Sequence, residues 1–174
     1  MPDSSPYLQQ LGKLLPDLEE IGLQPVLVGG MALVILGSRR VTEDYDFVIS
    51  QEGLNRKDLM KVFYRNGFEL ASKIDKNGAI IDTIDNQNVA AARMAIDTPA
   101  SIYFLNKKTQ LRIDLLFDFP LPAKELIRRA EKKKIQSCVF RVASKEDLLR
   151  LKEIANQDRN LATDAQDLEF LKNL

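Results

Sequence analysis

The hydrophobic residues near the start of the chain recur at the spacing of a helix face. The positions concerned are Leu8, Leu11, Leu14, Leu15 and Leu18. Residues 5–21 are therefore predicted to form a helix, which Pro16 is expected to kink or split because proline lacks a backbone N–H donor. The residues that follow, 24–28, end in three apolar residues and predict a short strand that leads into a turn at Gly29 and Gly30.

The remaining patterns predict both helices and strands. Strong helix formers occupy residues 31–37 and stop at a glycine of the kind that ends helices. Amphipathic or charged helical patterns cover residues 54–68, 122–134, 145–157 and 162–174. Strand-like patterns cover residues 45–50, 78–84, 88–96, 101–119 and 136–144. The segment 101–119 is expected to be a hairpin, since residues 106–109 form a polar turn within it.

This order of elements predicts an α/β (α+β) fold, in which a mixed β-sheet is flanked by helices. Ser144 is expected to cap the first of two closing helices, with Asp147 three residues later as a variant of the capping box. We expect residues 1–142 to form the core and residues 143–174 to form a helical extension packed on it, the two together making one compact unit.

Composition narrows the range of functions. Lys plus Arg and Asp plus Glu number 25 each, so the chain lacks the general basic field of a nucleic-acid-binding protein. The basic residues 128–134 are a local exception: they either guide an RNA acceptor or form a solvated helix end. The single cysteine, Cys138, is expected to be a buried structural thiol. The chain has no disulfide pair, signal-peptide pattern or long apolar run, which favours a cytoplasmic protein without a membrane partner.

The sequence contains no histidine. Catalysis by Ser-His-Asp or Cys-His groups is thereby excluded, and so are histidine-rich zinc sites. Acid–base chemistry would fall mainly to carboxylates, lysines or tyrosines. A metal bound by side chains would have oxygen ligands, which Mg²⁺ and Mn²⁺ prefer.

Candidate chemistry begins where the predicted strand enters a helix at Gly29 and Gly30. Glycines let a ligand approach backbone N–H groups, and a helix N-terminus favours phosphate. A plain turn is the alternative. Asp44 and Asp46, two positions apart, would point to one face of a strand. They either bind a cation, which would relieve their repulsion, or form a solvated strand end.

Asp114 changes this balance because it interrupts the apolar residues 113–117. A charged side chain in a buried strand needs a partner. If this strand lies beside the one with Asp44 and Asp46, three carboxylates converge beside a glycine turn. Such a group suits one or two Mg²⁺ ions in a phosphoryl- or nucleotidyl-transfer site. Asp118 lies near the end of the strand and is expected to be solvated.

These residues resemble the signature of the DNA-polymerase-β-type nucleotidyltransferase superfamily, and in particular its minimal members related to abortive-infection toxins. The matching positions are Gly29, Gly30, Ala32, Gly37, Arg40, Thr42, Asp44, Asp46 and, on a later strand, Asp114. Residues 143–171 are similar to the closing helices of the family, whose pattern of Lys, Arg, Asp and Asp is matched by Lys152, Arg159, Asp164 and Asp167. Two positions depart from the pattern: Met31 replaces a common serine, and Thr163 replaces a frequent lysine.

The resemblance implies a polymerase-β-like fold and roles for individual residues. Asp44, Asp46 and Asp114 would bind Mg²⁺ or Mn²⁺ and carry the catalysis, Asp114 also helping to deprotonate the attacking hydroxyl. Gly29, Gly30, Arg40 and Lys152 would contact the triphosphate. The alternatives are that Arg40 lies in a solvated loop and that Lys152 only pairs with a nearby carboxylate.

The implied reaction moves a nucleoside monophosphate from a nucleoside triphosphate (NTP) to a hydroxyl of RNA such as a tRNA end, of a protein or of a small molecule. The closest resemblance suggests a toxin with an antitoxin protein as its partner. One alternative is a non-catalytic module that keeps the fold and binds a nucleotide or a protein. Another is an interaction protein in which the three carboxylates are surface residues and Asp114 does not face Asp44 and Asp46.

Overall fold

The computed structural model describes residues 5–96, 99–159 and 161–174. Its centre is one mixed sheet with the strand order β4-β3-β5-β6-β2-β1-β8-β7. The strands are β1 (Val26–Val28), β2 (Tyr45–Ile49), β3 (Glu69–Ile74), β4 (Ile80–Ile84), β5 (Ser101–Leu105), β6 (Arg112–Phe117), β7 (Glu131–Ile135) and β8 (Cys138–Val142). Two neighbouring pairs, β2 with β6 and β1 with β8, are parallel, and the other pairs are antiparallel.

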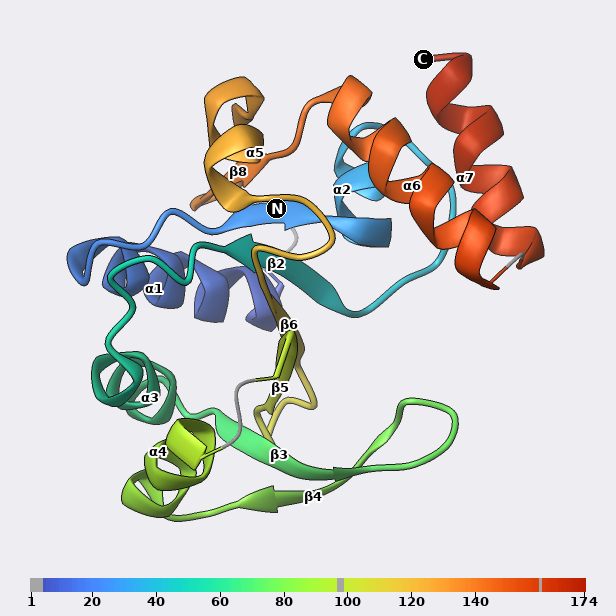
Figure 1. Ribbon diagram of the computed structural model, residues 1–174. Coiled ribbons are helices and arrows are strands. Elements are labelled where there is room, and N and C mark those ends of the chain that lie inside the picture. Colours follow the sequence, from blue (N-terminus) through green and yellow to red (C-terminus); the bar gives the residue numbers. More distant parts are fainter. Residues whose placement is uncertain (1–4, 97–98, 160) are drawn as a thin grey trace.

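Two groups of helices lie on different sides of this sheet (Figure 1). The helices are α1 (Pro6–Glu20), α2 (Gly29–Ile35), α3 (Arg56–Arg65), α4 (Gln87–Ile96), α5 (Ala123–Arg129), α6 (Lys145–Arg159) and α7 (Ala162–Lys172). In one group α3 contacts both α1 and α4, and in the other α2 contacts both α6 and α7. The α/β fold class predicted from the sequence, a mixed sheet flanked by helices, is confirmed.

The first helix follows its hydrophobic pattern closely. All five leucines of the stripe are buried in α1, and the Ser5 hydroxyl accepts a hydrogen bond from the Tyr7 N–H. Pro16 does not divide the helix, although it removes one backbone donor. The buried leucines lie on both sides of Pro16, so packing against the core holds the two halves in one element.

The core lies between the sheet and the helices α1 and α3. Alternate residues of β6 are buried there, and the ring of Phe63 from α3 stacks on that of Phe104 from β5 with centroids 3.8 Å apart. The opposite positions of β6 therefore face the other side of the sheet, where Asp114 is found.

Three local predictions need correction. Residues 88–96 were expected to be a strand but belong to α4, because the Asn86 side chain caps the N–H groups of Asn88 and Val89 and alanines then favour a helix. The helix expected over residues 122–134 ends at Arg129, and the lysines that follow lie in β7, an edge strand of the sheet. Charged residues are common on edge strands because they oppose pairing with other chains.

The third correction concerns β3, which the hydrophobic pattern does not single out. Its pairing with β4 shifts register on either side of Lys73, so apolar and polar residues do not alternate cleanly. Other predictions are confirmed: β5 and β6 form the expected hairpin, and the Ser144 hydroxyl accepts from the Asp147 N–H at 3.1 Å, as expected of a cap for α6.

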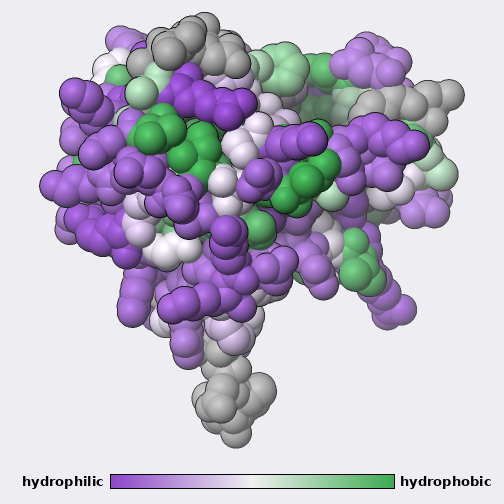
Figure 2. Space-filling model, turned by 90° about the horizontal axis from the view of Figure 1, so that it is seen from below, coloured by the Kyte–Doolittle hydropathy of each residue, from purple (hydrophilic) through white to green (hydrophobic). Residues whose placement is uncertain are grey.

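The surface beneath β3 and β4 is mainly polar. Figure 2 views the molecule from this side and shows hydrophilic residues over most of the face, with hydrophobic residues in small separate patches. Such a face suits contact with water better than a large apolar interface. Within the described residues, none of the helices has both the length and the apolar character needed to cross a bilayer.

Candidate active site

Asp46 and Asp114 are direct neighbours in the sheet. They are paired in the parallel register of β2 and β6, so their side chains leave the same face of the sheet. Burial, followed by the nearby carboxylates of Asp114 and Asp44, raises the pKa of Asp46 to about 7, while Lys152 opposes this rise. Burial also raises the pKa of Asp114. Two carboxylates are thus held together in a place that disfavours their negative charge.

Asp44 completes this acidic group from the segment before the strand. It lies one residue before β2, rather than within it, and is exposed to solvent. Its charge nevertheless raises the pKa of both Asp46 and Asp114, which shows that it is close to them. Among the residues that the structure describes, no three acidic or cysteine side chains form a ready-made cluster for a metal ion. The carboxylates would therefore have to adjust in order to share one.

The glycine pair makes room for two charged side chains. Gly29 has a φ of +71°, and a Cβ at this position would lie 2.3 Å from Oδ2 of Asp46. A Cβ at Gly30 would lie 2.8 Å from Cζ of Arg40. Both predicted phosphate-contacting glycines therefore lie against predicted site residues. Met31 packs against the hydrophobic core, so the side chain that replaces the common serine serves the fold.

Arg40 and Lys152 meet at a buried carboxylate. Nη1 of Arg40 donates to Oδ2 of Asp167, and Nζ of Lys152 lies 2.9 Å from the same oxygen. Lys152 is also 3.7 Å from Oδ1 of Asp164. The Asp164 and Asp167 side chains are only 2% and 4% exposed, so these carboxylates hold the two cations from the side of α7. Arg159 has a side chain that lies outside the described part of the structure.

The position of Lys152 connects this ion-pair group to the acidic group. Its charge lowers the pKa of Asp46, so the lysine acts across the space between α6 and β2. One donor of Arg40 is unpaired: its Nε is buried and has no hydrogen-bond partner among the described residues.

Arg112 and Tyr103 are site residues that the sequence reasoning missed. Arg112 contacts both carboxylate oxygens of Asp114, with Nε 2.8 Å from Oδ1 and Nη2 3.3 Å from Oδ2. Its guanidinium also lies over the Tyr103 ring, 4.8 Å from the centroid, and Tyr103 pairs with Asp114 across β5 and β6. The two-residue spacing of Arg112 and Asp114 in one strand was the available signal, since it puts both on one face.

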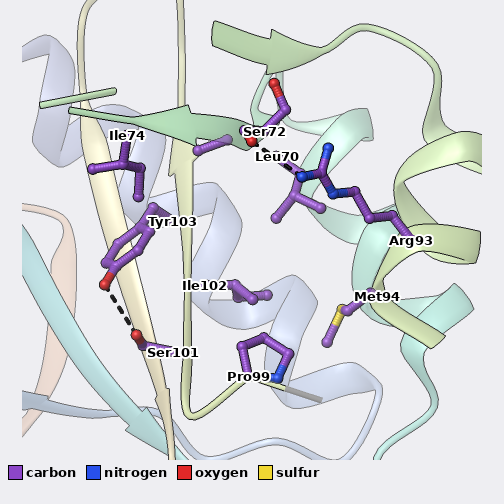
Figure 3. Close-up of a pocket in the computed structure, with 10 residues that line it drawn as sticks. Leu70, Ser72, Ile74, Arg93, Met94, Pro99, Ser101, Ile102 and Tyr103 are labelled. Carbon is purple, nitrogen blue, oxygen red and sulfur yellow. Dashed lines mark hydrogen bonds between the residues drawn. The ribbon is translucent and has the colours of Figure 1, made fainter. Parts of the chain in front are cut away.

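A cavity of about 260 Å³ opens where β3 and β5 diverge (Figure 3). Tyr103 and Ile74 lie on one side of the gap in Figure 3, and Met94 and Arg93 of α4 close the other. None of the predicted site residues lines this cavity. Of its lining residues, Tyr103 pairs with Asp114 in the sheet, and the Tyr103 hydroxyl is 3.0 Å from the Ser101 hydroxyl.

Two other residues have structural roles: Cys138 is a buried thiol, as expected, whereas Asp118 was expected to be solvated but is half-buried and bonded to the backbone. Asp118 accepts hydrogen bonds from the backbone N–H groups of Gln51 and Ala123, at 2.9 Å and 2.8 Å, and so joins the segment after β2 to the start of α5. Cys138 is 1% exposed, and burial raises the pKa of its thiol to about 11. A thiol with such a pKa is almost entirely protonated near neutral pH and is not a nucleophile.

Solved structures of similar fold include several nucleotidyltransferases. An antigenic nucleotidyltransferase-like protein from Paracoccidioides brasiliensis has 15% sequence identity and a TM-score of 0.59, with 97% of this chain and 76% of that chain covered. The lincosamide antibiotic adenylyltransferase LnuA, solved with lincomycin, has 13% identity and a TM-score of 0.57, with 94% and 95% covered. The antibiotic-resistance factor ANT(2'')-Ia has 13% identity and a TM-score of 0.58, with 94% and 81% covered. At these identities the likeness establishes the fold.

Family membership rests on the sequence. Among curated proteins, none is similar enough to match the chain. A family model described as "Nucleotidyl transferase AbiEii toxin, Type IV TA system" matches residues 14–174, which include β1, the acidic group and both closing helices. This span confirms the resemblance to nucleotidyltransferases related to abortive-infection toxins and supports transferase activity. The chain therefore belongs to the AbiEii family of nucleotidyl transferase toxins of type IV toxin–antitoxin systems.

Proposed function

We propose that this protein is a metal-dependent nucleotidyltransferase that moves a nucleoside monophosphate from an NTP to an acceptor hydroxyl. The observation that carries the proposal is the pairing of Asp46 with Asp114, two partly buried carboxylates side by side, of which Asp46 also lies against Gly29. Their mutual repulsion, together with burial, disfavours the doubly charged pair. A bound cation would reverse this, because its charge favours both ionised carboxylates.

The donor set fits Mg²⁺ or Mn²⁺. Asp44, Asp46 and Asp114 offer only carboxylate oxygens, which these hard cations prefer. When bound, such a cation supplies positive charge that stabilises the phosphates during transfer. Asp44 and Asp46 would hold the cation that contacts the NTP. Asp114 would face the acceptor hydroxyl and help to take its proton.

The residues on the other side of the site bind the triphosphate. Lys152 presents positive charge near Asp46, Arg40 lies against Gly30, and the two glycines carry no side chain that would cover the backbone there. In the reaction, the acceptor oxygen bonds to the α-phosphorus as the bond to the bridging oxygen of the β-phosphate breaks. Pyrophosphate leaves with the electron pair, and the hydroxyl proton passes to Asp114 or to water. The side chains of Lys152 and Arg40 would neutralise charge that develops on the phosphates.

The acceptor is RNA such as a tRNA end, a protein or a small molecule. Family membership supports a toxin whose partner is an antitoxin protein. The names of two neighbours in fold, a lincosamide adenylyltransferase and ANT(2'')-Ia with adenylyl-tobramycin, illustrate small-molecule acceptors on this fold. The alternative of a non-catalytic binding module has little use for all three carboxylates, Asp44, Asp46 and Asp114.

The decisive experiment incubates the protein with each α-³²P-labelled NTP, Mg²⁺ and either total RNA or lysate. Label should appear in one class of acceptor and with a preferred base. Asp46→Asn should abolish transfer, whereas Asp85→Asn, a matched change at an exposed aspartate, should leave it intact. If no NTP labels any acceptor while NTP with Mg²⁺ still binds, the protein is a nucleotide-binding module without this activity.

A further inference from the structure

Arg112 makes contacts in three directions. Its Nε and Nη2 atoms engage the two oxygens of Asp114, its guanidinium lies over Tyr103, and Nη1 donates to the backbone carbonyl of Gly78. The Arg112 and Asp114 side chains are only 18% and 16% exposed. One partly buried cation therefore joins a carboxylate of the acidic group to the turn between β3 and β4.

This arrangement conflicts with metal binding at Asp114. A two-point guanidinium–carboxylate contact engages both oxygens of Asp114 and leaves only part of their lone-pair capacity for a metal ion. A divalent cation at Asp114 would also be repelled by the adjacent guanidinium, and the repulsion is strong where water is largely excluded. Arg112 and a metal ion therefore compete for Asp114.

The far end of the contact is a turn with hydrogen bonds of its own. The Asp75 carboxylate accepts from the Asn77 and Ala79 N–H groups at 2.8 Å and 2.9 Å, which fixes the turn that contains Gly78. The pairing of β3 with β5 covers only Glu69 and Leu70, so the outer part of the hairpin extends beyond that pairing. Figure 1 shows this part projecting from the sheet.

We propose that Arg112 acts as a latch between the metal site and the β3–β4 hairpin. Without metal, it neutralises Asp114 and holds the turn through Gly78. A divalent cation takes over Asp114, and Arg112 then leaves the carboxylate and releases the turn. Because linkage is reciprocal, holding the hairpin weakens metal binding to the same extent that metal loosens the hairpin. The inference rests on the metal site of the proposed function.

The test measures metal affinity and hairpin opening in the full chain, with Mn²⁺ as the probe. Electron paramagnetic resonance of free Mn²⁺ gives Kd, and tryptic cleavage after Lys76, an exposed residue of the turn, reports opening. In the wild type, Mn²⁺ should accelerate this cleavage several-fold. In Arg112→Gln, cleavage should be fast without metal and insensitive to Mn²⁺, and Mn²⁺ should bind roughly tenfold or more tightly because a neighbouring positive charge is gone.

Arg93→Gln is the matched control. Arg93 also ties the hairpin, donating to the Ser72 carbonyl at 3.2 Å, but it does not contact Asp114. This change should ease cleavage modestly, preserve its response to Mn²⁺ and leave Kd close to that of the wild type. Arg112→Lys, which keeps the charge and loses the two-point contact, should fall between the wild type and Arg112→Gln, and it replaces Arg112→Gln if that variant does not fold.

Two results overturn the latch: the same Kd in the wild type and Arg112→Gln, or cleavage of the wild type that ignores Mn²⁺. Asp46→Asn separates this failure from failure of the proposed function. If Asp46→Asn loses Mn²⁺ while Arg112→Gln matches the wild type, the metal site stands and only the latch is wrong. If Asp46→Asn binds Mn²⁺ as the wild type does, or if no variant binds it, both proposals fail.

Discussion

Single residues at this site are constrained by several neighbours at once. Gly29 must adopt a positive φ, and the space where a side chain would begin is filled by Asp46. Asp46 in turn lies beside Asp114, which Arg112 contacts. A change at one of these positions therefore alters the environment of the next, and stability and function should respond together.

Gly29→Ala should destabilise the protein more than the same change at Gly22. Gly22 has a φ of +89° and open space around its Cβ position, so Gly22→Ala should cost about 1–2 kcal/mol from backbone strain alone. Gly29→Ala adds the clash with Asp46, which should cost a further ~1–3 kcal/mol. Urea unfolding measures both changes. Equal losses for the two variants would contradict the packing of Asp46 against Gly29.

Asp46→Asn should stabilise the metal-free protein at pH 8. The pKa of Asp46 is raised to about 7 in the folded state from an ordinary value of 3.8. A raised carboxyl pKa favours folding at low pH, and this advantage is lost as the pH rises through the folded pKa. Asparagine has no charge to bury and avoids this loss. Relative to the wild type, the free energy of unfolding of the variant should therefore be higher by on the order of 2–4 kcal/mol above pH 7 and unchanged below about pH 4.

Urea unfolding in EDTA across pH 4–8 checks this prediction. A variant less stable than the wild type at pH 8 would show that Asp46 is not under electrostatic stress. Mg²⁺ should then stabilise the wild type and have little effect on Asp46→Asn, because the amide is a poor metal ligand by comparison. A protein that gains stability when a site residue is neutralised illustrates the conflict between function and stability.

At the scale of elements, local patterns predicted some segments well and others poorly. The leucine stripe of α1 and the hairpin of β5 and β6 follow directly from periodicity. In contrast, α4 depends on capping by Asn86, and β7 is a lysine-rich strand because β8 offers it an edge to pair with. A single-sequence pattern does not reveal an edge, since the neighbouring strand that creates it is defined only by the assembled sheet.

The joint between α5 and α6 depends on one buried carboxylate. Asp147 is 1% exposed and accepts two hydrogen bonds from Arg129, at 2.9 Å and 2.8 Å. Arg129→Met should lower the melting temperature, because it leaves Asp147 with only the longer contact to Arg150 at 3.4 Å. Arg128→Met, a matched change at the adjacent exposed arginine, should have a smaller effect. Calorimetry on both variants tests this, and equal shifts would argue against the joint.

At the scale of the whole molecule, the site lies between two parts of the fold. The carboxylates come from β2, β6 and the segment before β2, whereas Lys152 comes from α6 and is held by α7. The triphosphate would bridge these parts, as would a cation at the carboxylates. Ligand binding should therefore stabilise the whole unit rather than one element.

An NTP together with Mg²⁺ should raise the melting temperature of the wild type. At a ligand concentration of about 100 times Kd, binding adds ~2.7 kcal/mol to the free energy of unfolding, which raises the melting temperature of a domain of this size by roughly 5–10 °C. Asp44→Ala combined with Asp46→Ala should abolish the shift, whereas Asp85→Asn should keep it. A full shift in the double variant would place the nucleotide elsewhere. Comparison of the four NTPs would also show which base is preferred.

The sequence by itself determined the features that depend on near neighbours in the chain. These include the helical periodicity, the glycine turn at the end of β1, and the charged residue within the apolar β6. It also carried the family signature, from Gly29 to Asp46 and again at Asp114. Such features are legible because each depends on residue types at fixed short spacing.

Only the tertiary structure decided how these features meet. The parallel register of β2 and β6 sets Asp46 beside Asp114, although 67 residues separate them in the chain, and a shift by one residue would have turned them to opposite faces. The burial of Asp167 between Arg40 and Lys152 and the contact of Arg112 with Gly78 likewise arise from packing. Long-range pairing depends on the free energy of the whole assembled core, which no local spacing records.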